Sequence, residues 1–228
     1  MTFQMYLFNY SKSPIRLMYP ELDEKAYVPI DLSVDSRDLK TYHLHSSLTF
    51  SDFIKNHLES HQKKIAFGGY LEKRQLYSRS SHFSSQNPEY QRNIHLGVDL
   101  WCAEATPVLA AFDGEVHSFK NNTAFGDYGP TIILKHSVNG MTFFSLYGHL
   151  SLASIAPLKV GKKINAGDVI GYLGGPDING DYPPHLHFQL IKDMQGNVGD
   201  YPGVCCEKEL EFYKQNCPDP NLFLKLTH

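Results

Sequence analysis

The feature that most limits the fold of this chain is a series of short β-rich runs between Gly68 and about Leu190, each closed by a turn. The runs TPVLAAFDGEVHSF, PTIILKHSVNGMTFFSLYGHL, KKINAGDVIGYLGG and PPHLHFQLI are rich in β-branched and aromatic residues, and Gly, Asn, Asp and Pro separate them. Short strands joined by tight turns pair with their neighbours in antiparallel order. The sequence therefore predicts a mainly β domain built on an antiparallel sheet.

A helical pattern precedes this domain, in SLTFSDFIKNHLESHQKK. Its large apolar residues recur at the spacing of one helix face: Phe50, Phe53, Ile54 and Leu58. Thr49 or Ser51 is the predicted N-cap of the helix. We therefore divide the chain into a mixed α/β N-terminal region of unassigned role at 1–66, the β domain at 67–193 and a tail at 194–228 that docks a few apolar side chains. The expected class is α+β overall.

Composition and charge exclude several classes of partner. The chain has 228 residues, 42% of them hydrophobic, which is enough for a sizeable core. A formal net charge of -3 provides no basic field for nucleic acid or an anionic membrane. No apolar run approaches the roughly 18 residues of a transmembrane segment, and no secretion signal is visible, so a soluble protein is expected. The cysteines lack C-x-x-C spacing and are predicted to be buried thiols: Cys102, Cys205, Cys206 and Cys217.

The stretch PPHLHFQL, residues 183–190, places two imidazoles on one face of a strand, because successive side chains of a strand point to opposite faces. One face carries Leu186, Phe188 and Leu190, and the other carries His185, His187 and Gln189. The first face is predicted to join the core. The second is predicted to belong to a functional site.

Two further polar segments come earlier. In NIHLGVDLW, His95, Gly97 and Asp99 lie on one strand face, and the glycine leaves clearance for an ion. In SLYGHLS, a hydrophobic strand ends at His149. Imidazole and carboxylate together suit zinc, which takes three protein ligands in catalytic sites and keeps one position for water. Four histidines and one aspartate exceed that need by two.

The excess predicts two roles within the H-x-H pair. If an ion takes His95, Asp99 and one histidine of the pair, the other histidine lies about 6 to 7 Å along the strand, where it contacts the metal-bound water. Zinc lowers the pKa of that water towards about 7, and a neutral imidazole can accept its proton. The remaining histidine can stabilise charge on the attacked carbonyl oxygen.

These segments resemble the lysostaphin-type, or LytM-like, zinc endopeptidases. The shared pattern is H-x-x-x-D, a later histidine after a tyrosine-rich strand and a closing H-x-H, over roughly residues 92–190 and including TPVLAAFDGEVHSF, GPTIILKH, LYGHL and LKVGKKINAGDVIGYLG. The resemblance implies an antiparallel sheet whose groove accepts an extended peptide, commonly a peptidoglycan cross-bridge or stem peptide. It implies the following roles: His95, Asp99 and His187 bind Zn2+, and His149 and His185 are catalytic without binding it.

Two features depart from the family pattern. Relatives have a small Thr-Gly or Ser-Gly element before H-x-H, whereas this chain has the bulkier and stiffer Asp181-Tyr182-Pro183-Pro184, which predicts a narrow substrate channel. The family usually acts in the periplasm or cell envelope, whereas the absence of a visible leader predicts a cytoplasmic protein or a processed chain.

Two other functions remain open. A metal-free regulatory or binding module of the same fold is disfavoured because all five polar positions are present. A lipoyl- or biotinyl-type carrier is suggested by AAFDGEVHSF and VGKKINAGDVIGYLG, but we find no modifiable lysine at a hairpin tip between these halves. Zinc content and intact mass distinguish the three functions. The oligomeric state is not indicated.

The remaining polar residues receive simpler interpretations. His136, beside a turn, is expected to be structural. His43 and His45 copy the H-x-H spacing in the polar context TYHLHSS and are expected to be solvated. Tyr90 or Tyr128 is a candidate to assist in stabilising the oxyanion.

Overall fold

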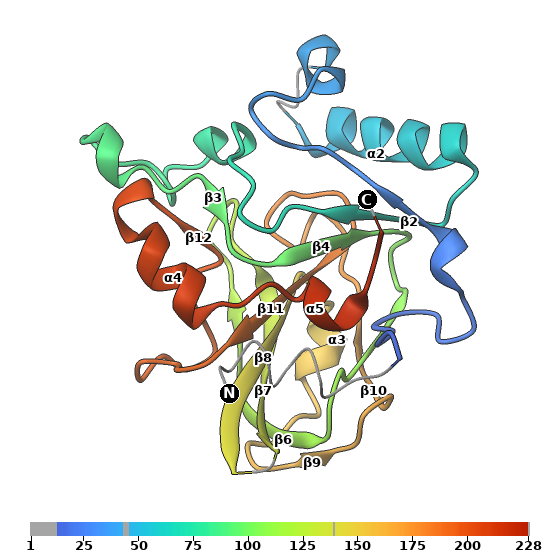
Figure 1. Cartoon of the computed structure of the whole chain (residues 1–228), viewed down its shortest axis with the longest axis vertical. Coiled ribbons are helices and arrows are strands. Elements are labelled where there is room, and N and C mark those ends of the chain that lie inside the picture. Colours follow the sequence, from blue (N-terminus) through green and yellow to red (C-terminus); the bar gives the residue numbers. More distant parts are fainter. Residues whose placement is uncertain (1–12, 43–45, 139, 228) are drawn as a thin grey trace.

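The computed structural model describes residues 13–42, 46–138 and 140–227, so His43 and His45 lie outside the described residues. The described part forms an eight-stranded sheet, two two-stranded sheets and short helices around them (Figure 1). The strands are β1 Tyr27–Pro29, β2 Ile65–Gly68, β3 Ile94–His95, β4 Val98–Trp101, β5 Pro107–Leu109, β6 Gly114–Asn122, β7 Gly129–Val138, β8 Met141–Gly148, β9 Lys163–Ile164, β10 Val169–Tyr172, β11 His185–Ile191 and β12 Val204–Cys205. The α-helices are α2 Ser47–His61, α3 Leu152–Ile155, α4 Leu210–Asn216 and α5 Asn221–Leu224, and the 3-10 helices are η1 Glu24–Ala26, η2 Asp38–Thr41, η3 Leu76–Arg79, η4 Pro88–Tyr90 and η5 Glu207–Glu209.

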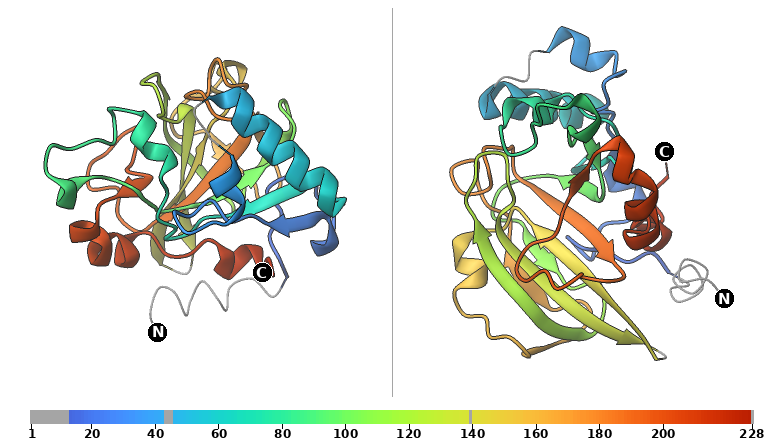
Figure 2. Two further views of the ribbon diagram at one scale, coloured as in Figure 1. Left: turned by 90° about the horizontal axis from the view of Figure 1, so that it is seen from above. Right: turned by 90° about the vertical axis from the view of Figure 1, so that its left-hand side faces the viewer.

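The large sheet has the order β1-β2-β4-β11-β8-β7-β6-β9. Its neighbours are antiparallel, apart from the parallel pair of β1 and β2. β2 pairs with β4, so the N-terminal region extends the same sheet that the β-rich segment forms. Along the long axis of the molecule, α2 lies at the opposite end from β6 and β9 (Figures 1 and 2). The predicted mainly β fold, with a helix in the N-terminal region, is confirmed.

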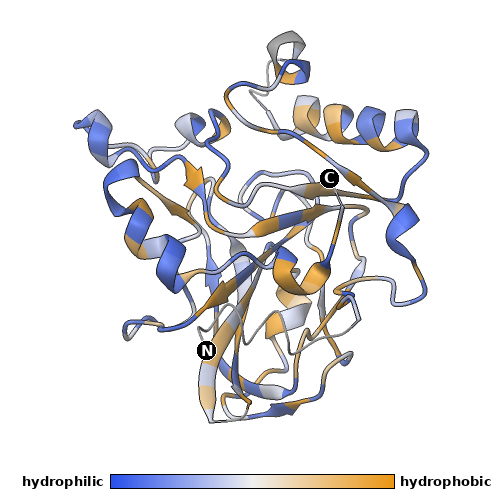
Figure 3. Cartoon of the chain, viewed as in Figure 1, coloured by the Kyte–Doolittle hydropathy of each residue, from blue (hydrophilic) through white to orange (hydrophobic). Residues whose placement is uncertain are grey.

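Helix α2 packs with the face that its sequence pattern predicts. Phe50, Phe53 and Ile54 are buried, and Figure 3 shows apolar and polar residues alternating along the helix. The predicted N-cap at Thr49 or Ser51 is wrong. Ser46, in extended backbone conformation, accepts the N–H of Thr49 through its side chain, because the cap must lie outside the helical turn whose N–H groups it satisfies.

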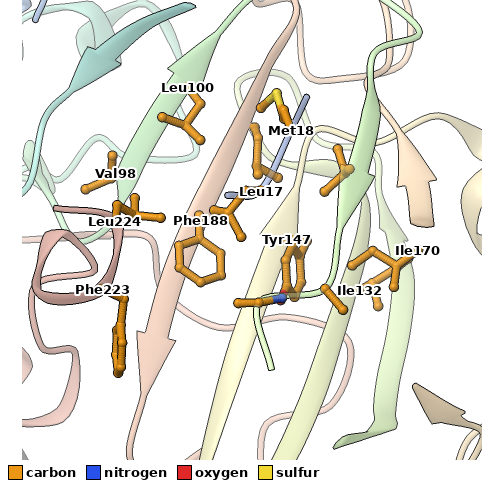
Figure 4. Packing of buried hydrophobic residues seen from close by; sticks show 14 of the residues in the cluster. Leu17, Met18, Val98, Leu100, Ile132, Tyr147, Ile170, Phe188, Phe223 and Leu224 are labelled. Carbon is orange, nitrogen blue, oxygen red and sulfur yellow. The ribbon is translucent and has the colours of Figure 1, made fainter. Parts of the chain in front are cut away.

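The apolar face of β11 lies in the main core. The side chains of Leu186, Phe188 and Leu190 are each 0% exposed, as the alternation predicts. They pack with residues from both ends of the chain, including Leu17 and Phe223 (Figure 4). The four cysteines are buried free thiols, as expected.

None of the described helices is both long enough and apolar enough to cross a membrane.

Candidate metal and catalytic site

Strand register brings the polar segments together. β11 lies between β4 and β8, and His187 is directly opposite Asp99 on one side and Gly148 on the other. Residues directly opposite each other on antiparallel strands present their side chains on the same face. His149 follows Gly148 at the end of β8, so the second segment ends beside the third. The same register places His185 opposite Trp101.

The three predicted ligands converge in a geometry that suits a metal ion. His95 Nε2 lies 2.8 Å from His187 Nδ1, and Asp99 Oδ1 lies 3.2 Å from each of these nitrogens. A tetrahedral zinc ion with ligands at about 2.0 to 2.1 Å holds its ligand atoms about 3.3 Å apart. The three residues are buried, so an ion held between them is shielded from bulk water. The donor set and its spacing therefore fit a metal such as zinc.

Neighbouring acceptors orient the imidazoles of both candidate ligands. His95 Nδ1 lies 2.9 Å from the carbonyl oxygen of Gly69, and His187 Nε2 lies 2.9 Å from Gln189 Oε1. With a proton on each of these nitrogens, the opposite nitrogens carry lone pairs and face each other. Such outer contacts fix the tautomer and the ring direction in metal sites. Gln189 was identified from the sequence only as sharing the face of the H-x-H pair.

Gly97 provides space for a ligand ring rather than for an ion directly. The sequence places it on one strand with its neighbours, but the structure ends β3 at His95 and begins β4 at Val98. A Cβ atom at Gly97 would lie 2.7 Å from His187 Cε1 and 2.7 Å from the carbonyl oxygen of Phe188. The absence of a side chain thus allows the imidazole of His187 to pack against the backbone.

A buried arginine completes the surroundings of Asp99. Arg74 Nη1 donates to Asp99 Oδ2 at 2.6 Å, and its Nε donates to Glu72 Oε2 at 2.5 Å. Burial raises the pKa of Asp99, but the neighbouring His95 and Arg74 more than offset this, so the net pKa lies well below the usual range. Asp99 is therefore a carboxylate at neutral pH. Sequence reasoning missed Arg74, because the contact depends on tertiary pairing: Arg74 follows β2, and its backbone N–H donates to the carbonyl oxygen of Asn93, just before β3.

Burial also keeps His95 neutral. It lowers the pKa of His95, with a further contribution from the positive charge of Arg74, to about 3. A metal ion binds the neutral imidazole, so His95 is ready to act as a ligand throughout the physiological pH range.

The two further histidines face each other beside the ligand set. Their ring centroids are 4.0 Å apart. His149 Nδ1 lies 2.8 Å from the carbonyl oxygen of Asn179, and His185 Nδ1 lies 2.8 Å from that of Pro183. Protons on these nitrogens leave each Nε2 as the basic atom. His185 Nε2 is 4.0 Å from Asp99 Oδ1, next to the ligand cluster.

Both of these imidazoles are neutral at pH 7. Burial lowers the pKa of His185 to about 4. Burial, together with His185 and His187, lowers the pKa of His149 well below its usual value. His149 also has a φ of 62°, a left-handed conformation that is uncommon outside glycine and is often found at functional sites. The arrangement provides two uncharged proton acceptors beside a metal-ligand cluster.

Aromatic side chains form the walls of the pocket that contains these residues. Tyr128 OH lies 3.5 Å from His187 Nε2 and donates to the carbonyl oxygen of Tyr201 at 3.2 Å. Tyr128 thus lies at the site, whereas Tyr90 is half exposed and lies against Lys208. Tyr182 is buried and also lines the pocket, where its ring contacts the ring of His149.

Trp101 is a second pocket residue that the sequence analysis did not single out. Its indole stacks on the imidazole of His185, with ring centroids 3.9 Å apart and an angle of 17° between the planes. Its Nε1 has no acceptor among the described residues, although the side chain is buried. The sequence did contain a signal for this position: Trp101 lies two residues after Asp99 on the same strand, so both side chains lie on the same face.

His136 lies away from this pocket and is held by its own contacts. Its ring is buried, with Nε2 2.6 Å from Ser145 Oγ and Nδ1 2.9 Å from the carbonyl oxygen of Asp113. These contacts agree with the expected structural role.

Comparison with known proteins identifies the segment that carries the site. Residues 93–198 match the model of peptidase family M23. These residues form a peptidase family M23 domain. The resemblance to lysostaphin-type metallopeptidases that the motifs predicted is therefore confirmed, and the M23 domain contains all five predicted site residues.

Individual relatives match the M23 domain over similar lengths. A DD-carboxypeptidase/endopeptidase of Neisseria meningitidis serogroup B is 34% identical over 96 residues, which are 42% of this chain and 20% of that protein. A peptidoglycan DD-endopeptidase of Vibrio cholerae is 32% identical over 102 residues, which are 44% of this chain and 21% of that protein. The solved catalytic domain of lysostaphin from Staphylococcus simulans has 28% identity, with 54% of this chain and 80% of that chain covered and a TM-score of 0.37. The chain spans about a fifth of the length of these two curated relatives.

Proposed function

We propose that this protein is a zinc-dependent metalloendopeptidase that hydrolyses peptide bonds in peptidoglycan cross-bridges or stem peptides. The observation that supports this most is the convergence of His95 Nε2, Asp99 Oδ1 and His187 Nδ1, with separations of 2.8 to 3.2 Å, beside two further neutral histidines. A metal-free module would not need buried ligands in this geometry. The match to family M23 supports the same reaction class.

The five residues divide into a metal set and a proton-transfer set. His95, Asp99 and His187 hold the zinc ion, which when bound supplies Lewis acidity that activates water and polarises a carbonyl group. His149 and His185 present their Nε2 atoms to the same pocket. One accepts a proton from the attacking water, and the proton passes to the amine nitrogen that leaves as the peptide C–N bond breaks. The other is also basic at Nε2, so it donates a hydrogen bond to the developing negative charge on the carbonyl oxygen only once it has gained a proton, and that negative charge favours its protonation.

The lining of the pocket favours a narrow, extended substrate. Tyr77, Tyr128 and Tyr182 are among its lining residues, and each of the three is buried. The bulky approach through Tyr182 restricts the channel, so a slender backbone such as a glycine-rich or D-amino-acid bridge fits better than a folded protein. The Vibrio relative is named for its action on peptidoglycan, and we propose the same polymer, and hence the cell envelope, for this chain.

Digestion of two substrates side by side tests the proposal. Zinc-loaded protein is incubated with muropeptides and with an unfolded casein-like protein, and the products are identified by mass spectrometry. Metal-stripped protein and His187→Ala serve as controls. We expect cleavage of muropeptides and little action on the unfolded protein. General proteolysis with intact muropeptides would contradict the substrate class, and cleavage of neither substrate would favour a regulatory module.

A further inference from the structure

The N-terminal region lies outside the M23 match, yet it packs directly behind the catalytic histidines. We propose that β1, the segment after it as far as Leu32, α2 and β2 are part of the catalytic apparatus, because they hold Trp101 against His185 and so fix the position of that imidazole. Trp101 is then a positioning residue. The inference rests on the proposed function for the role of His185, but the packing that it describes can be measured without a substrate.

Three aromatic rings form a column that leads from the helix to the catalytic site. The imidazole of His185 lies parallel to the indole of Trp101, at 3.9 Å between centroids. The ring of Phe50, from α2, lies 5.0 Å from the indole at an angle of 53°. All three side chains are buried, with exposures of 3%, 1% and 1%. A displacement of Phe50 is therefore transmitted to His185 through one intervening side chain.

The column belongs to a hydrophobic cluster that the N-terminal region largely builds. Two of its buried members lie at the catalytic site, namely Trp101 and Tyr182. The other buried members come from β1, α2, β2 and the segment after β1: Val28, Ile30, Leu32, Phe50, Phe53, Ile54 and Ala66. Tyr182 makes edge contacts with His149 and His185, at centroid distances of 5.3 and 5.7 Å. Both non-ligand histidines thus contact members of this cluster, His185 through Trp101 and Tyr182 and His149 through Tyr182.

A single hydrogen bond fixes the ring of His185, between its Nδ1 and the carbonyl oxygen of Pro183 at 2.8 Å, and the ring can tilt about it. Its other ring neighbours are His149 at 4.0 Å and Tyr182 at 5.7 Å between centroids, and neither lies parallel to it. A group that takes and returns a proton must keep its nitrogen within a narrow range of position, and a misplacement of about 1 Å can cost about 10²-fold in rate. The stack with Trp101 restrains that tilt. The ligands His95 and His187 have their own acceptors, Gly69 and Gln189, so loss of the stack leaves metal binding intact.

Substitutions along the column test the inference. Trp101→Leu removes the stacking ring, Trp101→Phe keeps a ring and removes the indole N–H, and Phe50→Leu removes the support. Phe53→Leu is the matched control, because Phe53 lies on the same helix, is buried in the same cluster and has its ring contacts with Tyr42 and His57. For each variant we would measure zinc content, the melting temperature, kcat and KM on the cleaved muropeptide.

We expect Trp101→Leu to lower kcat by about 10- to 100-fold with zinc content and KM near wild type. Trp101→Phe should retain kcat within about threefold, since a flat ring still covers the imidazole. Phe50→Leu should lower kcat clearly more than Phe53→Leu at a similar loss of melting temperature. Equal kcat values for Phe50→Leu and Phe53→Leu, together with a wild-type kcat for Trp101→Leu, would overturn the inference.

A spectroscopic readout keeps the test independent of the substrate. The ring current of an indole shields the protons of an imidazole stacked on it, so the His185 ring protons should resonate upfield in wild type by NMR. The shielding should vanish in Trp101→Leu, weaken in Phe50→Leu and persist in Phe53→Leu. If the wild-type protein cleaves nothing, the proposed function fails while this pattern still supports the packing. A His185 resonance that is unchanged in Phe50→Leu would overturn the inference whether or not the protein is active.

Discussion

Replacement of Gly97 by alanine should weaken zinc binding without removing any ligand. The backbone of Gly97 is not in the left-handed region, so alanine introduces no conformational strain there. The new methyl group, however, would lie 2.7 Å from His187 Cε1 and 2.8 Å from His187 Nε2, whereas ordinary contacts begin near 3.4 Å. The imidazole would have to retreat by the difference, 0.7 Å. The methyl group would also lie 2.7 Å from the carbonyl oxygen of Phe188, and this backbone atom cannot swing aside as a side-chain end can.

The size of the effect follows from that displacement. Metal sites hold their ligand distances to within about 0.2 Å, so a shift of 0.7 Å takes His187 Nδ1 out of bonding geometry unless the backbone adjusts. Inserting a methyl group into a packed site typically costs about 1 to 3 kcal/mol. If the strain is relieved when the ring leaves the metal, zinc affinity falls by about 5- to 150-fold, at about 1.4 kcal/mol for each factor of ten.

Competition with a chromophoric chelator measures the zinc affinity. Gly175→Ala is the matched control, since Gly175 also has no left-handed backbone and its nearest neighbours are the ends of two acidic side chains, Glu104 Oε1 at 2.9 Å and Asp177 Oδ1 at 3.0 Å. Those ends can swing aside, so zinc affinity should stay within about twofold of wild type. Wild-type zinc affinity in Gly97→Ala would show that His187 does not depend on this clearance and would refute the reasoning.

Four further predictions concern single side chains. His187→Ala should lose zinc while the protein stays folded, as measured by elemental analysis and circular dichroism; full zinc stoichiometry would count against the ligand assignment. His149→Ala and His185→Ala should keep zinc and lose about 10²- to 10⁴-fold in kcat, and a wild-type rate would remove that residue from the mechanism. Arg74→Gln should lower zinc affinity by about 10- to 100-fold, measured by chelator competition, because the ligand carboxylate loses its orienting partner. Burial lowers the pKa of His136 to about 4. As the pH falls from 6.5 to 4, the unfolded chain therefore binds a proton that the folded chain does not, and the free energy of unfolding should decrease by up to about 3 kcal/mol. In urea unfolding, His136→Gln should show a shallower pH dependence than wild type, and an equal slope would contradict this.

The sequence predicted those features that a local pattern encodes. The two faces of β11 followed from the period of two along a strand, because a shift of one residue would turn Leu186 and Phe188 towards the polar pocket and the histidines towards the apolar core. The family motifs then selected the three candidate ligands, whose donor atoms converge in the structure. By contrast, Ser46 was missed as the cap of α2 because several hydroxyl residues precede and begin that helix, and the choice among them depends on backbone conformation.

Contacts between elements could not be read in the same way. Arg74 reaches Asp99 because the segment after β2 pairs with residues 93 and 94, and Phe50 reaches Trp101 because α2 docks on that part of the sheet. Neither contact leaves a period or a motif in the sequence. The residues that surround a site are therefore harder to predict than those that form it, since their identity depends on tertiary packing.

The indole emission of this protein comes from a single place. Trp101 is the only tryptophan in the chain, and its ring lies 3.9 Å from the ring of His185. A protonated imidazole in contact with an indole quenches its fluorescence much more strongly than a neutral one. Steady-state emission thus reports the charge and position of the His185 side chain without any label, so a ligand that moves this ring can be followed optically in the native protein.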